Sequence, residues 1–196
     1  MKFNEDKCKE AVKLLLESFG EDINREGLKE TPRRVAGYWK ELLEGNEYTN
    51  QEIADKFTKD FEVSSNPLVV KEVKNVFSHC EHHLALMYNM KVVVAYVPVK
   101  LDNGKYKVIG LSKIPRIVDL CSKRLQLQEK LAEDIAECIS LATGSNDIYV
   151  NIIGDHACVS ARGAKSDGFT DVTYLKGKFE TNIALREEVE RKINKR

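Results

Sequence analysis

Hydrophobic residues near the start of the chain recur at helical spacing. The range Asn4–Phe19 carries an apolar stripe on one helical face, and Gly20 after it predicts the end of that helix. The dipeptide Thr31-Pro32 is typical of a second helix start, with the threonine hydroxyl as N-cap and proline at the first helical position. Gly45 is expected to close this second helix.

A short third helix is expected over Gln51–Phe57, with Asn50 as its cap. The run Ser64-Ser65-Asn66-Pro67 after it favours a loop over regular structure. We therefore expect the chain to have two parts, an N-terminal helical region over residues 1–65 and a larger domain over residues 66–196.

Beyond that loop the hydrophobic period changes from the helical to the extended kind. Valine-rich segments predict strands over Leu68–Phe77 and Met90–Val99. The turn signal Asp102-Asn103-Gly104 indicates a short hairpin that returns through Tyr106–Ile109. The later strands are expected over Ile148–Ile152 and Thr170–Leu175, with the segment His156–Ala161 between them.

Two predicted helices separate the early strands from the late ones. One begins at Ser112, and the other carries apolar residues from Leu127 to Ala142 before Gly144 stops it. A charged amphipathic helix follows the last strand. The order strand, strand, helix, helix, strand, strand indicates an α+β fold, an antiparallel sheet with its helices on one face. The unpaired edges of such a sheet favour association between subunits.

Composition narrows the possible partners. The 196 residues include 31 basic and 31 acidic side chains, so no overall field attracts nucleic acid or an anionic membrane, and we expect neither as a partner. An anionic ligand would have to be bound by locally gathered lysines and arginines. The cysteine count is odd, at five, and neither a signal peptide nor a bilayer-spanning apolar run is apparent. We therefore expect a cytoplasmic protein with reduced thiols.

Chemistry-bearing side chains concentrate in two short segments. The segment Ser78-His79-Cys80-Glu81-His82-His83 contains three of the four histidines of the chain. The fourth, His156, stands two residues before Cys158. Thiolate sulfur and neutral imidazole nitrogen are the ligands that Zn²⁺ prefers.

The spacing within each segment predicts how these residues meet. Cys80 and His83 would lie on the same side of a single helical turn. His156 and Cys158 would point to the same face of a strand. The economical interpretation is one zinc ion held by Cys80, His83 and Cys158, with His82 and His156 free to move protons. Three protein ligands and one open position are typical of a catalytic zinc site.

Plainer interpretations exist for each residue taken alone. A single cysteine is more often a buried thiol, and a single histidine is more often a surface or core residue. A structural zinc site would need a fourth ligand, and the chain has no C-x-x-C pair to supply it. The other three cysteines fall at helical positions without such partners and are interpreted as core or half-buried thiols: Cys8, Cys121 and Cys138.

Basic residues gather at a few places despite the neutral total. Lys113 and Arg116 lie in the first turn of the helix that begins at Ser112, where backbone N–H groups and the macrodipole favour an anion. Arg162 follows the second cysteine–histidine segment, and Arg34 lies at the start of the second helix. An isolated lysine or arginine is more often a solvated surface charge. Their grouping nevertheless favours an oligophosphate site.

One acidic side chain, Glu129, is also singled out. A buried carboxylate can accept two N–H bonds from a guanine or amide edge, although the pattern fits a helix-surface acid equally well. Taken together, these motifs resemble those of the GTP cyclohydrolase I family over nearly the whole chain. The residues that carry the resemblance are Arg25-Glu26-Gly27-Leu28, Glu30-Thr31-Pro32-x-Arg34-Val35-Ala36, Cys80-Glu81-His82-His83, Val108-Ile109-Gly110-Leu111-Ser112-Lys113-Ile114-x-Arg116, Leu127-Gln128-Glu129, and His156-x-Cys158 with Ala161-Arg162-Gly163.

The resemblance implies a tunnelling fold, in which ββααββ units join edge to edge into a barrel, usually as a homodecamer with sites between subunits. It implies zinc-dependent hydrolysis of GTP at C8 of guanine. Formate is released and 7,8-dihydroneopterin triphosphate is formed, the first step of folate or tetrahydrobiopterin synthesis. The implied roles are zinc binding by Cys80, His83 and Cys158, proton transfer by His82 and His156, guanine binding by Glu129 and Gln128, triphosphate binding by Lys113, Arg116, Arg162 and Arg34, and ribose contact by Ser112.

One segment departs from the family pattern. Members commonly continue C-E-H-H with L-L-P-F-x-G, whereas this chain has Leu84-Ala85-Leu86-Met87-Tyr88-Asn89, so a different turn into the second strand is expected. Other functions fit less well. A zinc-dependent nucleobase deaminase requires a P-C-x-x-C motif, which the chain lacks. A binding module of the same fold that had lost catalysis need not keep all three ligands and both histidines.

Overall fold

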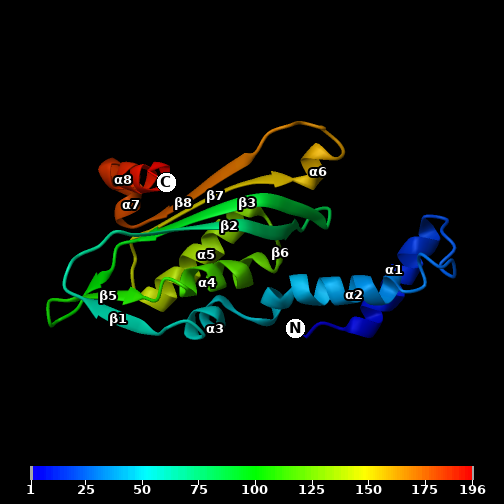
Figure 1. Cartoon of the computed structure of the whole chain (residues 1–196), viewed down its shortest axis with the longest axis horizontal. Coiled ribbons are helices and arrows are strands. Elements are labelled where there is room, and N and C mark those ends of the chain that lie inside the picture. Colours follow the sequence, from blue (N-terminus) through cyan, green and yellow to red (C-terminus); the bar gives the residue numbers. More distant parts are fainter. Residues whose placement is uncertain (1, 196) are drawn as a thin grey trace.

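The computed structural model describes residues 2–195. Its N-terminal part is an arm of two helices that projects from the body of the molecule (Figure 1), α1 (Glu5–Ser18) packed against α2 (Thr31–Leu42). The side chain of Asn4 caps α1 by accepting a hydrogen bond from the backbone N–H of Lys7 at 2.9 Å. Only one residue of α1, Val12, is buried, so most of the predicted apolar stripe remains at the surface.

The caps of the next two helices differ from the predictions. Thr31 is itself the first residue of α2, and its hydroxyl does not cap the helix, because the preceding residue Glu30 occupies the N-cap position. The short helix α3 (Asn50–Asp55) is capped by Thr49, whose side chain forms a capping box with Glu52. The predicted caps at Thr31 and Asn50 were therefore wrong. At α3 the backbone N–H of Glu52 donates to the hydroxyl of Thr49, and the backbone N–H of Thr49 donates to the carboxylate of Glu52. This reciprocal pair explains why Thr49 rather than Asn50 is the cap.

A single glycine fixes how α2 joins the body. Gly45 lies in a 3-10 helix, η1 (Glu44–Glu47), and is buried. A Cβ atom at this position would lie 2.1 Å from the backbone oxygen of Leu120. The chain therefore continues from the arm into the body through a contact that only glycine permits.

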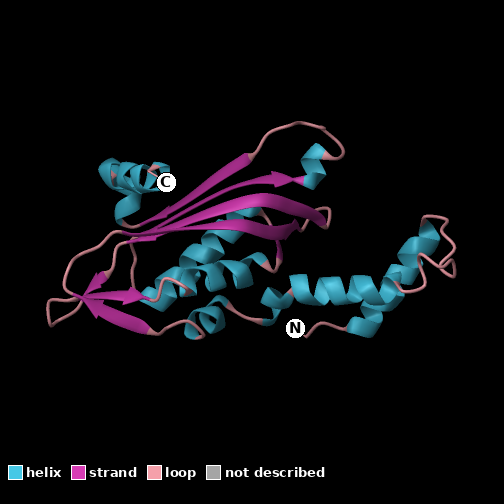
Figure 2. Ribbon diagram, viewed as in Figure 1, coloured by secondary structure: helices cyan, strands magenta, loops and turns pink. Residues whose placement is uncertain are grey.

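The body is built on a five-stranded sheet in the order β6-β2-β3-β7-β8 (Figures 1 and 2). Its four long strands pair antiparallel, as predicted, and β6 pairs parallel with β2 at the end of that strand. The α+β class and the order of two strands, two helices and two strands are thus confirmed. The strands are β2 (Val69–Cys80), β3 (Ala85–Tyr96), β6 (Leu125–Gln126), β7 (Ile148–His156) and β8 (Thr170–Lys176).

A second, smaller sheet has the order β1-β5-β4. It contains the predicted hairpin, β4 (Val99–Lys100) and β5 (Tyr106–Ile109), together with β1 (Asp60–Val63). The proposed boundary at residue 65 falls between β1 and β2, and β1 pairs with β5 of the following region. The division into two domains stays a prediction.

Helices cover both faces of the large sheet. On one face α4 (Lys113–Ser122) and α5 (Gln128–Thr143) enclose the main core with alternate residues of the strands. On the other face Phe179 of α7 (Lys178–Thr181) and Val189 of α8 (Ile183–Asn194) pack on a smaller apolar cluster. The prediction that the two helices of the ββααββ order lie on one face is therefore confirmed for α4 and α5, whereas α7 and α8, which that prediction did not place, cover the other face. Both faces of the central strands are apolar here, so both need cover.

Two of the thiols predicted to be structural lie in the main core. The Sγ atoms of Cys121 and Cys138 are 3.6 Å apart between α4 and α5, and both residues are fully buried. Cys8 is half-buried on α1. The interpretation of these three cysteines as core or half-buried thiols is confirmed.

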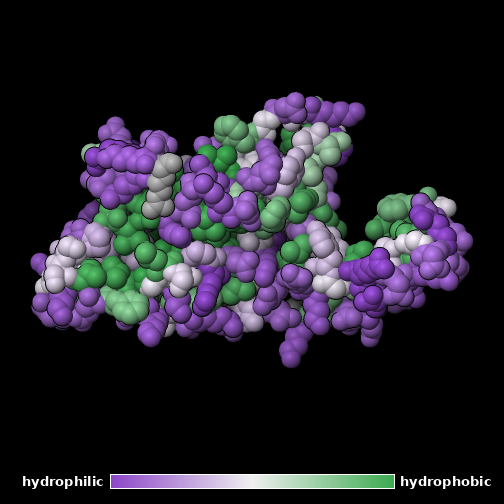
Figure 3. All heavy atoms as spheres, in the orientation of Figure 1, coloured by the Kyte–Doolittle hydropathy of each residue, from purple (hydrophilic) through white to green (hydrophobic). Residues whose placement is uncertain are grey.

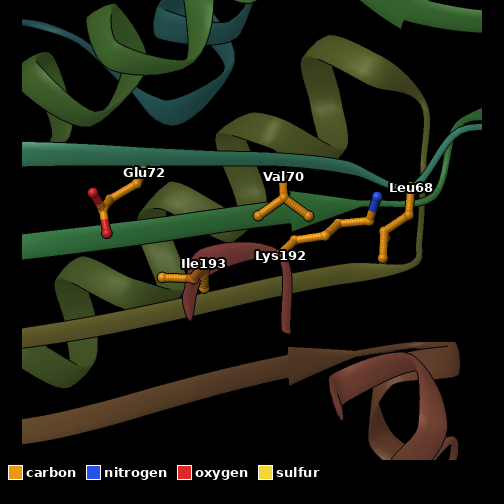
Figure 4. A pocket seen from close by; sticks show the side chains of 5 residues that line it. All are labelled: Leu68, Val70, Glu72, Lys192 and Ile193. Atoms are coloured by element: carbon orange, nitrogen blue, oxygen red, sulfur yellow. The ribbon is translucent and has the colours of Figure 1, made fainter. Parts of the chain in front are cut away.

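The surface has apolar residues in two notable places. Leu14 and Leu15 of α1 and Phe19 directly after it are exposed, and hydrophobic side chains are visible on the arm in Figure 3. A pocket of about 210 Å³ lies where α8 meets β2, with Lys192 and Ile193 beside Val70 (Figure 4). None of the predicted site residues lines that pocket. No helix within residues 2–195 is long and apolar enough to cross a membrane.

Candidate metal centre

Strand pairing brings the two cysteine–histidine segments to the same end of the large sheet. β2 ends at Cys80, and the chain reverses through residues 81–84 before β3 begins at Ala85. β7 ends at His156, which lies opposite Met87 of β3 in the register of the pair. Residues more than seventy positions apart in the sequence thus meet where three neighbouring strands end.

Three of these side chains form a group that could bind a metal ion. The sulfur atoms of Cys80 and Cys158 and a ring nitrogen of His83 all lie within 4.8 Å of one another. A tetrahedral zinc ion with bonds of about 2.0–2.3 Å joins ligand atoms that are less than about 4 Å apart. The donor set of two thiolates and one imidazole therefore fits zinc in kind and nearly in position. The three predicted ligands are brought together as expected.

The backbone that carries these ligands differs from the predictions. His83 lies in a tight turn between β2 and β3, not on a helix, and the next residue, Leu84, has a positive φ of 52°. Cys158 lies on the short helix α6 (Ala157–Ser160), not on a strand, because β7 ends at His156. The three ligands converge as predicted, but the turn and the short helix that carry His83 and Cys158 differ from the backbone that their spacing predicted.

The segment that departs from the family pattern, Leu84–Asn89, lies within β3 apart from its first residue, because β3 begins at Ala85. Tyr88 of this strand lies with its hydroxyl 3.2 Å from Oγ of Ser160 on α6. Ser160 also donates a hydrogen bond of 3.1 Å to the backbone oxygen of His156. The helix that carries Cys158 is therefore held against β3 by a residue of the atypical segment.

The electrostatics of the two thiols favour a cation. Burial raises the pKa of Cys158, the neighbouring Cys80 raises it further, and the positive charge of Arg162 lowers it. Two thiolates side by side repel each other, so a divalent cation between them would stabilise the ionised pair.

His79 directly precedes Cys80, at a spacing from His83 that a structural zinc site could use. It is 3 % exposed and points instead to the N-terminal arm, where its Nε2 lies 2.9 Å from the hydroxyl of Tyr38. The ring of Trp39 packs edge-on against the same imidazole. His79 is therefore committed to packing the arm on the body and does not act as a fourth ligand in this structure.

A cavity of about 370 Å³ adjoins the three ligands. It is large enough for a ring system of a small metabolite. Its lining includes both histidines that were assigned proton transfer and the two residues assigned to guanine. Among the residues that line it are His82, His83, Gln126, Gln128, Glu129 and His156.

The two histidines of the cavity have different surroundings. His82 is exposed in the turn, with its ring at a right angle to that of His83 and the centroids 6.3 Å apart. His156 is half-buried, and burial lowers its pKa below the usual 6.5, while the negative charges of Glu129 and Asp155 act in the opposite direction. The neutral ring of His156 is thus favoured over the charged one.

Sequence reasoning did not assign a role to Gln126, which lies beside Cys80 in the parallel pair of β6 and β2. Its amide nitrogen donates to the backbone oxygen of Cys121 at 2.8 Å and to Oγ of Ser78 at 3.0 Å. Its Oε1 is buried and has no hydrogen-bond partner in the described part of the chain. A buried acceptor of this kind calls for a donor from water or a ligand.

The predicted phosphate-binding residues are only partly brought together. Arg162 lies beside the centre, with Nη1 3.3 Å from Nε2 of His83. Ser112, Lys113 and Arg116 lie at the start of α4, whereas the end of that helix adjoins β6 and Cys80. A ten-residue helix separates its two ends by roughly 14 Å. Arg34 is exposed on the arm. Within one chain the structure therefore unites one of the four predicted basic residues with the metal ligands.

Fold and centre together define an α+β protein with a candidate mononuclear metal site that opens into a small-molecule cavity. The sequence profile described as GTP cyclohydrolase I matches residues 8–194. The chain belongs to the GTP cyclohydrolase I family, a family of enzymes, as its motifs predicted.

The sequences of individual relatives align with this chain over most of their length. GTP cyclohydrolase 1 of Clostridium beijerinckii is 45% identical over 195 residues, which covers 95% of this chain and 95% of that protein. GTP cyclohydrolase 1 of Clostridium acetobutylicum is 48% identical over 181 residues, 89% of each. Among solved structures, the archaeosine synthase QueF-Like in the apo form matches 58% of this chain with a TM-score of 0.45 at 20% identity, a likeness too low to add to the assignment.

Proposed function

We propose that this protein is a zinc-dependent GTP cyclohydrolase I that hydrolyses GTP at C8 of guanine, releases formate and forms 7,8-dihydroneopterin triphosphate. The observation that carries the proposal is the convergence of Cys80, His83 and Cys158 beside a cavity lined by His82 and His156. Membership of the family supports the same reaction.

The chemistry of the donor set suits the first step. A bound zinc ion would supply the Lewis acidity that makes a water molecule nucleophilic near neutral pH. Cys80, His83 and Cys158 would hold the ion, and three protein ligands leave one position for exchangeable ligands. The protein thereby provides a nucleophile without a strong base of its own.

The histidines would manage the protons. Addition of water at C8 makes that carbon tetrahedral, and proton transfer to N7 by His82 or His156 lets electrons be accepted as a C8–N bond breaks. A second hydrolysis breaks the remaining C8–N bond and releases C8 as formate. The ribose chain then opens, rearranges and closes on the two exposed amines with loss of water. The net change is uptake of one water molecule per formate released.

Glu129 and Arg162 would bind the two ends of the substrate. A carboxylate accepts two N–H bonds from the guanine edge, and the guanidinium of Arg162 meets phosphate oxygens as a planar fork. Glu129 lines the cavity and Arg162 lies beside His83. Substrate would thus span the centre from the base to the phosphates.

The remaining basic residues would come from a neighbouring subunit. Ser112, Lys113 and Arg116 lie at the far end of α4 from the centre of their own chain, and Arg34 lies on the arm. β6 pairs with β2 only at His79 and Cys80, so most of that edge has no strand neighbour among residues 2–195. These features support a tunnelling fold in which sheets join edge to edge, a homo-oligomer and usually a decamer, with sites between subunits.

The proposal is tested by incubating the purified protein with GTP and measuring formate and, after oxidation, a fluorescent pterin. Both products are expected, and a zinc chelator should abolish both until zinc is restored. GTP consumption without formate would reject the assignment. A cytoplasmic location, and the absence of nucleic acid and membrane partners, stay predictions.

A further inference from the structure

The side-chain amide of Gln128 is held between three polar groups at the wall of the cavity. Its Nε2 donates to the backbone oxygens of Ile152 at 2.8 Å and Thr170 at 3.1 Å. Its Oε1 lies 2.7 Å from Nε2 of His156. Gln128 is only 1 % exposed, so these contacts rather than solvent determine how the amide is oriented.

Only one orientation of this amide satisfies its neighbours. Backbone carbonyl oxygens accept hydrogen bonds and cannot donate them, so the NH₂ group of Gln128 must face Ile152 and Thr170. The flipped amide would set Oε1 against two acceptors and aim both N–H groups at a single imidazole. A buried polar group left without its partner in this way is strongly disfavoured. The oxygen of Gln128 must therefore face His156.

The orientation of the amide determines the state of the imidazole. An amide oxygen can only accept, so Nε2 of His156 must carry a hydrogen to make the 2.7 Å contact. In the neutral ring the other nitrogen, Nδ1, is then the bare acceptor. None of the hydrogen bonds found within residues 2–195 involves Nδ1 of His156, and His156 lines the cavity. Nδ1 is thus the nitrogen left for a bound molecule.

We propose that Gln128 is a positioning residue that fixes His156 as the Nε2–H tautomer and so makes Nδ1 the nitrogen that exchanges protons with the substrate. The tautomer follows from contacts within the chain, whereas its use on a purine rests on the proposed function. Both amide hydrogens of Gln128 are used by the protein itself. The side chain of Gln128 therefore offers guanine no donor, and of the two side chains assigned to the base only that of Glu129 remains to hold it.

The tautomer can be read directly, without substrate. Nitrogen NMR of the purified protein labelled with ¹⁵N-histidine, at alkaline pH where the ring is neutral, distinguishes a protonated from a bare ring nitrogen. The chain has four histidines, so His156 is identified by the signals that disappear in His156→Gln. We expect a protonated Nε2 and a bare Nδ1 in the parent protein. A ring protonated at Nδ1 would overturn the proposal.

Two variants of Gln128 separate positioning from packing. Gln128→Met keeps the volume but removes the acceptor, so the two tautomers of His156 should become mixed. Gln128→Glu keeps an oxygen that accepts from Nε2–H, and in its protonated form the second oxygen donates to a backbone carbonyl in place of the amide NH₂, so the parent tautomer should be retained. Gln126→Met is the matched control, because it removes a buried amide that does not contact His156, and the parent tautomer should persist. An unmixed Nε2–H ring in Gln128→Met would overturn the role of Gln128.

Kinetics then connect the tautomer to turnover. Gln128→Met should lower kcat for formate release roughly 10–100-fold, with KM for GTP nearly unchanged, and Gln128→Glu should recover part of the loss. A change in KM alone would show that Gln128 binds substrate and would overturn the proposal. A parent protein with the Nε2–H ring but no formate release would instead refute the proposed function and leave the tautomer standing. If Gln128→Met fails to fold, the nitrogen NMR spectra of the parent protein and of Gln128→Glu still test which ring nitrogen of His156 carries the hydrogen.

Discussion

Tyr38 of α2 and His79 of β2 form a hydrogen bond of 2.9 Å between the phenol oxygen and Nε2, although 41 residues separate them in the sequence. Trp39 packs against the same ring, with centroids 4.8 Å apart. His79 directly precedes Cys80, so the projecting arm is anchored next to a candidate metal ligand. The arm therefore supports the strand end on which the centre is built.

Removing the hydroxyl of Tyr38 should weaken this anchor. Tyr38→Phe leaves the buried Nε2 of His79 without a partner, which should lower the free energy of unfolding by about 1–3 kcal/mol. Urea denaturation measures the change. Tyr106→Phe is the matched control, because no hydrogen bond of the Tyr106 hydroxyl is found within residues 2–195, and its effect should stay within about 0.5 kcal/mol. Equal losses in the two variants would contradict the role of the contact.

Acid should destabilise the protein through the same histidine. Burial lowers the pKa of His79 below the 6.5 of the unfolded chain. The unfolded state therefore takes up a proton first as pH falls, so stability is full above about 6.5 and declines between that value and the lower folded pKa. His79→Phe should flatten this decline in metal-free protein. Denaturation curves across that pH range test it, and an unchanged pH dependence in the variant would count against the assignment.

A buried ion pair should hold α3 and the strand β6 to α5. Arg124 donates to Asp134 at 2.9 Å and to Oδ1 of Asn50 at 2.8 Å, and the side chain of Asp134 is 6 % exposed. Arg124→Met leaves that carboxylate buried with Lys130 as its remaining cation, so unfolding should become easier by about 3 kcal/mol.

A surface pair provides the comparison for this prediction. Lys9 and Glu5 form a partly exposed surface ion pair of 2.8 Å on α1, and Lys9→Met should cost far less stability than Arg124→Met, because water screens the surface pair. Denaturant titration of both variants measures the difference. A loss below 1 kcal/mol in Arg124→Met would show that the buried network is not a stabilising feature.

Substitution of a metal ligand should remove bound zinc, whereas substitution of a proton-transfer residue should not. Cys158→Ala should lose stoichiometric zinc and formate release together, because it removes one of three ligands. His82→Ala should keep zinc and lose ring opening, because His82 lines the cavity without belonging to the ligand group. Metal analysis and formate assays of the two proteins check this. Parent-like activity in His82→Ala would refute the division of roles.

The identity of the site could be predicted because its chemistry lies in residue types that are rare elsewhere in the chain. Two short segments hold all four histidines and two of the five cysteines, and the ββααββ order indicates a sheet that can bring segments together. The local backbone could not be predicted. Whether Cys158 lies on a strand or on α6 depends on where β7 stops, and contacts such as Tyr88 with Ser160 determine that.

Long-range pairings explain the other differences. Asn50 is not a cap because its side chain is needed by Arg124 and Asp134, which lie far along the sequence. The hydrogen bond between His79 and Tyr38 forms because the arm packs on the body at this point. The spacing of residues within the segment of His79 does not indicate where the arm packs. The face of the sheet that α8 covers was not predicted, because the spacing of its apolar residues indicates a helix but does not indicate the face on which that helix packs.

The most direct test of the account is the zinc-edge X-ray absorption spectrum of the purified protein. The account predicts stoichiometric zinc with two sulfur atoms at about 2.3 Å and two nitrogen or oxygen atoms at about 2.0–2.1 Å, one of them from an exchangeable water. A third sulfur atom, a fourth protein ligand in place of water, or failure to bind zinc stoichiometrically would contradict it.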